Sequence, residues 1–100
     1  MTPAAFRQSL QRAQPGADLP RPLAALWWAA NGEWERAHRL VQGEASRDAA
    51  WVHAYLHRVE GDAGNARHWY GKAGRPPSSA PLDQEWEAIA SALLSAKRTD

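Results

Sequence analysis

The stretch from Asp48 to Gly74 constrains the fold most, because it contains two helical patterns separated by one turn. Asp48 can accept hydrogen bonds from the free backbone N–H groups at the start of a helix. Gly61 can adopt the left-handed conformation that ends this helix, and Asp62 can begin the next one. The apolar residues of the second helix recur at the spacing of one helical face, at Ala63, Ala66, Trp69, Tyr70 and Ala73. We therefore predict a helical hairpin over residues 48–74.

The pattern of this hairpin recurs upstream in the chain. Gly32 corresponds to Gly61 and Ala37 corresponds to Ala66, with an offset of 29 positions in both cases. Two segments with one register indicate an internal repeat. We predict a first hairpin over residues 22–44, with antiparallel helices like those of the second.

The remaining parts of the chain are two helices and two linkers. Thr2 and Pro3 suit the cap and the first position of a helix, which we expect over residues 3–14. The prolines of residues 15–22 cannot continue a regular helix, and those of residues 75–81 indicate an extended linker. A last amphipathic helix is expected over residues 82–97. The prediction is a single all-α domain of residues 1–100 with about five helices.

The segment EGDAGNARHWYGKAG, residues 60–74, resembles the second half of a tetratricopeptide repeat and, more closely, Sel1-like repeats. The resemblance covers roughly residues 23–74. The segment AYLHRVEGD, residues 54–62, is also similar to one in a group of short uncharacterised proteins. The resemblance implies a tetratricopeptide-like stack of the two hairpins that binds another molecule. We expect an N-terminal helix before this stack and a C-terminal helix that caps it.

Charge and composition exclude several classes of partner. The 12 basic and 11 acidic residues alternate along the chain, whereas phosphate backbones require a concentrated basic face. We therefore expect no binding of nucleic acid. No run of about eighteen apolar residues and no signal-peptide core is present, so we expect a cytoplasmic protein that does not enter a membrane. Cysteine is absent, which excludes disulfides and thiolate ligands.

Catalytic motifs are absent from the sequence. It contains neither a glycine-rich phosphate loop nor a G-x-S-x-G nucleophile motif. A chain of this length offers little room for an enclosed active site in addition to a core. We expect that the protein is not an enzyme and requires no cofactor.

A histidine pair is the first candidate site. His53 and His57 lie four residues apart, and Glu60 follows three residues later, so the three side chains can share neighbouring parts of one helical face. Two imidazoles and a carboxylate are a ligand set for a divalent metal. The position after the first histidine holds Ala54, so the H-E-x-x-H motif of zinc proteases is absent. We favour histidines that are hydrogen-bonded in or beside the core, with a metal or small-ligand site as the alternative.

The opposite face of the same helix is the second candidate. Trp51, Tyr55 and Arg58 are spaced to lie together, and aromatic residues with arginine are typical of interaction hot spots. Trp27 is a further candidate for this surface, because the repeat register places it nearer the edge than Trp28, although we favour core positions for both. Core packing is equally compatible with the pattern of Trp51 and Tyr55. The favoured hypothesis is a small helical-repeat module that binds a protein or peptide partner. A homodimer held through tryptophans is a third hypothesis.

Overall fold

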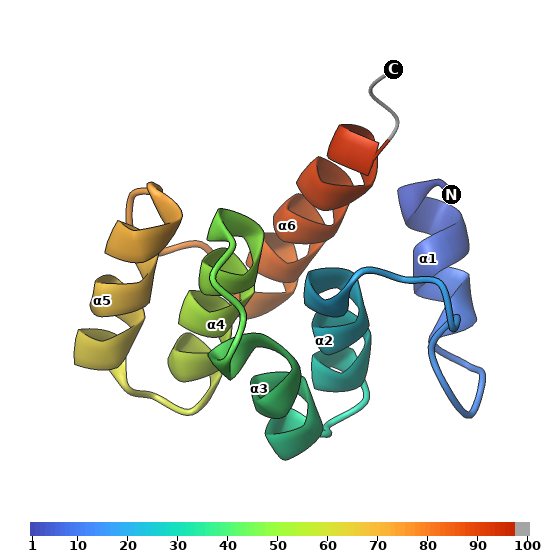
Figure 1. Cartoon of the computed structure of the whole chain (residues 1–100), viewed down its shortest axis with the longest axis horizontal. Helices are drawn as coiled ribbons and strands as arrows, with labels where there is room; N and C mark the ends of the chain where they lie inside the picture. The colour runs from blue at the N-terminus through green and yellow to red at the C-terminus, as the bar shows by residue number, and fades with distance from the viewer. Residues whose placement is uncertain (98–100) are drawn as a thin grey trace.

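The computed structural model describes residues 1–97, and in this range the chain forms six α-helices and no strand. They are α1 (Pro3–Ser9), α2 (Arg21–Ala30), α3 (Trp34–Gln42), α4 (Arg47–Val59), α5 (Ala63–Ala73) and α6 (Leu82–Lys97). The predicted all-α class is confirmed, with one helix more than the expected number. Short turns pair α2 with α3 and α4 with α5 (Figure 1). The predicted end of the domain at residue 100 lies outside the described residues.

Both hairpins use the same turn. Gly32 and Gly61 have positive φ angles of 78° and 84°, which glycine adopts without steric strain. The next backbone N–H in each turn donates to a carbonyl of the preceding helix: Glu33 to Trp28 at 2.9 Å, and Asp62 to His57 at 2.8 Å. These are Schellman motifs, which satisfy carbonyls that a helix end leaves free. The left-handed conformation expected at Gly61 is therefore confirmed.

Side-chain caps begin both helices of the second hairpin, Ser46 for α4 and Asp62 for α5, and only the second of these was predicted. The Asp62 carboxylate accepts a hydrogen bond from the N–H of Asn65 at 3.1 Å, as expected for a helix cap. Asp48 does not begin α4. The Ser46 hydroxyl accepts from the N–H of Ala49 at 3.0 Å instead, so the helix begins at Arg47.

Helix α1 is shorter than the predicted range of 3–14, because it ends at Ser9. The indole N–H of Trp27 donates to the Ser9 carbonyl at 3.2 Å. The N–H of Arg12 donates to the same carbonyl at 3.0 Å, in a tighter turn than that of an α-helix. The Ser9 carbonyl is thus used by tertiary and turn contacts, and Pro15 disfavours helical geometry shortly afterwards.

Helix α6 packs on both hairpins and on α1. It contacts α4, α2 and α1, and the indole N–H of Trp86 donates to the Leu26 carbonyl at 2.8 Å. Phe6 of α1 stacks on Trp86 with ring centroids 5.6 Å apart. The apolar face of α6 is therefore buried against α4 and α2 rather than at the end of a stack of hairpins. None of the described helices has the length and apolarity required to cross a bilayer.

Candidate functional site

Helix α4 lies at the centre of the fold, between α2, α3, α5 and α6. Every residue from Ala49 to His57 is buried. Polar side chains of this helix must therefore find partners inside the protein. These side chains lie on two sides of the helix, one facing α3 and α5 and the other facing α6.

The first side holds a group of three imidazoles, which we call the histidine cluster: His38 of α3 with His53 and His57 of α4. One ring nitrogen from each lies within 4.8 Å of the other two. Nε2 of His38 and Nε2 of His53 are 3.1 Å apart, so one of these rings donates a hydrogen bond to the other. His53 and His57 are buried and His38 is half-buried. The cluster therefore brings imidazoles from two helices to one point inside the protein.

Two tryptophans enclose this cluster. Trp34 stacks on His38 with centroids 4.7 Å apart, and Trp69 stacks on His53 with centroids 3.9 Å apart. The Trp34 indole N–H donates to the Leu56 carbonyl at 2.7 Å, which fixes this ring against α4. The stacked rings restrict the rotation of two of the three imidazoles. The site is consequently formed by the packing of the folded chain.

The environment of the cluster favours uncharged imidazole. Burial, together with the nearby His38, His57 and His68, lowers the pKa of His53 to about 4, and burial is the largest of these causes. The pKa of His38 is also lowered, first by burial and then by His57. Nδ1 of His53 is buried and has no hydrogen-bond partner among the residues that the structure describes. At neutral pH, His38 and His53 are therefore neutral imidazoles, the form that can bind a metal ion once the hydrogen bond between their Nε2 atoms is exchanged for the ion.

Glu60 takes a different place from the one expected. Its Oε2 lies 2.6 Å from Nδ1 of His57, so it holds that ring without joining the group formed with His53. The third imidazole comes instead from His38, which the sequence reasoning missed. Glu60 and Asp62 form a second, largely exposed group of oxygens around His57. The one signal for His38 was its position one helical turn after Trp34 on α3.

The second side of α4 corrects the predicted binding face. Trp51 and Tyr55 are only 8 % and 7 % exposed. The Arg58 guanidinium donates to the Glu85 carboxylate at 2.5 Å and to the Ala80 carbonyl at 2.8 Å. The expectation that these side chains line an open surface is therefore wrong. The physical reason is that α6 and the segment before it pack over this face of α4, with the Arg75 guanidinium carbon 3.6 Å from the Trp51 ring centroid.

Trp27 and Trp28 are reversed relative to the expected register. Trp27 is 1 % exposed and donates to the carbonyl and hydroxyl oxygens of Ser9, both at 3.2 Å. Trp28 is half-buried, and the Arg36 guanidinium lies 4.5 Å from its ring centroid. Because the end of α1 covers Trp27, this residue cannot contribute to an open contact surface.

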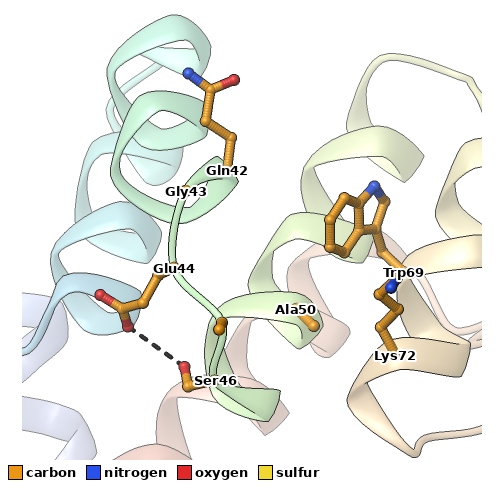
Figure 2. Close-up of a pocket in the computed structure, with 8 residues that line it drawn as sticks. Gln42, Gly43, Glu44, Ser46, Ala50, Trp69 and Lys72 are labelled. Carbon is orange, nitrogen blue, oxygen red and sulfur yellow. Dashed lines mark hydrogen bonds between the residues drawn. The ribbon is translucent and has the colours of Figure 1, made fainter.

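A pocket of about 330 Å³ lies next to the histidine cluster, between the α3–α4 connection and α5 (Figure 2). Trp69 lines this pocket and also stacks on His53. Glu44 and Lys72 place charges of opposite sign on its two walls. Trp69 is thus shared by the pocket and the cluster.

No protein-family model, curated protein or solved structure matches this chain. The resemblance to helical repeats and the role as an interaction module therefore stay predictions.

Proposed function

We propose that this protein binds a divalent transition-metal ion, with Zn²⁺ as the best fit, through His38, His53 and His57. The observation that carries the proposal is the convergence of three imidazoles from two helices, two of them with facing nitrogens 3.1 Å apart. Imidazole nitrogen is a ligand that zinc and other late first-row metals share. Glu60 is proposed to orient His57 and not to bind the ion directly.

The distances support one ion shared by the three rings. Two nitrogens bound to a tetrahedral Zn²⁺ at about 2.0–2.1 Å lie roughly 3.3 Å apart. The observed separation of 3.1 Å between His38 and His53 is close to this value. The His57 nitrogen lies within 4.8 Å of both, so a small movement of this ring would complete the set.

The protonation states support the proposal as well. A metal ligand must be neutral imidazole, and burial lowers the pKa values of His53 and His38. The contact of His57 with Glu60 at 2.6 Å is the carboxylate–histidine arrangement that fixes the tautomer of metal ligands. With Nδ1 of His57 bonded to Glu60, its Nε2 is available to the ion.

Three protein ligands leave a fourth position for water or another small ligand, as in zinc sites that exchange ligands. Hard ions such as Mg²⁺ prefer oxygen ligands and are expected to bind poorly. Ion binding is also expected to stabilise the fold, because the three ligands come from α3 and α4 and meet only when these helices are packed.

The test is a melting experiment on tag-free protein with Zn²⁺, with Mg²⁺ as the negative control. At a Zn²⁺ concentration of about 100 times Kd, the free energy of unfolding should rise by about 2.7 kcal/mol. His38→Gln should remove most of this rise. His68→Gln is the matched control, because His68 is the one histidine outside the cluster and is exposed. Glu60→Gln should weaken binding by roughly 10- to 100-fold.

Two results would contradict the proposal. One is a melting temperature of the parent protein that Zn²⁺ leaves unchanged. The other is a rise that survives in His38→Gln but disappears in His68→Gln, which would place the ion at the surface of α5.

A further inference from the structure

A second candidate site lies between α2 and α3, on the outer side of the first hairpin. A groove of about 360 Å³ is lined by Arg21, Trp28, Arg36, Arg39 and Leu40, and we call it the arginine groove. Its volume lies in the lower part of the range for small-molecule sites, about 300–1,000 Å³. It shares no lining residue with the histidine cluster or with the pocket beside it.

The spacing of residues along the two helices explains how the groove forms. Arg21 and Trp28 are seven residues apart and share one face of α2, while Arg36 and Leu40 are four residues apart on α3. The turn at Gly32 folds the two faces together. Arg36 stacks on Trp28 with its guanidinium carbon 4.5 Å from the ring centroid, which holds this arginine at the groove.

Positive charge is in excess at this place. Three guanidinium groups line the groove, and the nearest ion pair is between Nε of Arg21 and Glu44 at 3.8 Å. Within the described part of the chain, Arg36 and Arg39 form no ion pair. For a chain with a net charge of +1, this is a local concentration of three cations, of which only Arg21 has a carboxylate partner in the described structure.

We propose that the arginine groove binds a small anion that carries two or more phosphate groups. Guanidinium groups pair with phosphate oxygens through two parallel hydrogen bonds, and three of them can hold several phosphates at once. The phosphates could belong to a free polyphosphate or to a nucleotide, whose base would contact Trp28. The groove is too small for a nucleic-acid duplex, which agrees with the alternating charges of the whole chain.

The test is calorimetric titration of metal-free protein with inorganic tripolyphosphate and, separately, with ATP, at about 0.1 M salt, where contacts over long distances are screened. Saturable binding with one site is expected. Arg39→Gln should weaken it roughly 10- to 100-fold, because a charged hydrogen bond is lost. Arg39 has no ion-pair partner in the described structure, so this change should leave the melting temperature unaltered.

Arg67→Gln is the matched control, since it removes the same charge from an exposed residue of α5 outside the groove. Glu44→Gln should tighten binding, because it frees Arg21 from its ion pair.

Tighter binding of ATP than of tripolyphosphate would identify a nucleotide as the ligand, and equal affinities would identify the phosphate chain alone. Absence of saturable binding, an equal loss in Arg39→Gln and Arg67→Gln, or a failure of Glu44→Gln to tighten binding would overturn the proposal.

Discussion

The two sides of α4 both bury polar side chains, but they satisfy them to different degrees. On the side facing α6, the Glu85 carboxylate accepts hydrogen bonds from Arg58 and from the Tyr70 hydroxyl. On the side facing α3, Nδ1 of His53 has no partner among the described residues, and Nε2 shares one proton with His38. The polar groups facing α6 are therefore hydrogen-bonded to one another, whereas the histidines facing α3 still have a ring nitrogen without a partner in the described part of the chain.

The difference indicates what each side does. A buried charge with all its hydrogen bonds made is strongly destabilising to break, because removal of one partner leaves the other unpaired. A buried imidazole with one unpaired ring nitrogen contributes less to folding than a fully paired charge, and its other nitrogen is suited to bind an ion. We therefore assign the Glu85 network to stability and the histidine cluster to binding.

The largest expected effect is on the α6 side. Glu85→Ala should lower the free energy of unfolding by about 3–5 kcal/mol, because Arg58 and Tyr70 lose their common acceptor. Urea unfolding measures the loss. Glu87→Ala is the control, since the ion pair of Glu87 with Arg7 is exposed and should contribute less than about 1 kcal/mol. Equal losses in the two variants would remove the contrast between the sides.

The next effect is the pH dependence of stability. The pKa of His53 is about 4 in the folded protein and 6.5 in its unperturbed state, so the unfolded chain binds more protons between these values. Stability should therefore fall as pH falls from about 6.5 to 4, by about 3 kcal/mol at most from this residue. The measurement is the difference between the parent protein and His53→Leu across this range, which cancels other groups. Parallel curves for the two proteins would contradict the prediction.

The smallest expected effect is that of His53→Leu at pH 7.5. Leucine has a similar volume and no polar atoms, so it removes the unpaired Nδ1 together with the hydrogen bond to His38. Because His38 is half-buried and can bond to water instead, stability should change by less than about 1 kcal/mol without metal. The same variant should lose the stabilisation by Zn²⁺. A loss of several kcal/mol in metal-free protein would show that His53 is a structural residue.

Local signals in the sequence predicted much of the fold. Gly61 and Asp62 determined the end of one helix and the start of the next, because both effects depend on a few neighbouring residues. Contacts between distant segments were not predictable in this way. The path of α6 decided that Trp51 and Tyr55 are buried, and the end of α1 decided the same for Trp27.

The histidine cluster was predictable in part for the same reason. His53 and His57 are one turn apart on a single helix, so their proximity follows from helical spacing. His38 joins them only through the packing of α3 on α4. Glu60 lies near enough in sequence to reach His57. Its contact with Nδ1 places its carboxylate on the side of the ring away from His38 and His53, so it is not grouped with them.

X-ray absorption at the zinc edge, on tag-free protein loaded with one equivalent of Zn²⁺, tests the central claim most directly. We expect three imidazole nitrogens at about 2.0–2.1 Å and one further light ligand. His68→Gln should give the same spectrum, whereas His38→Gln should lose one imidazole. A spectrum with at most one imidazole, or one altered by His68→Gln and unaffected by His38→Gln, would contradict the assignment of the histidine cluster as the metal site.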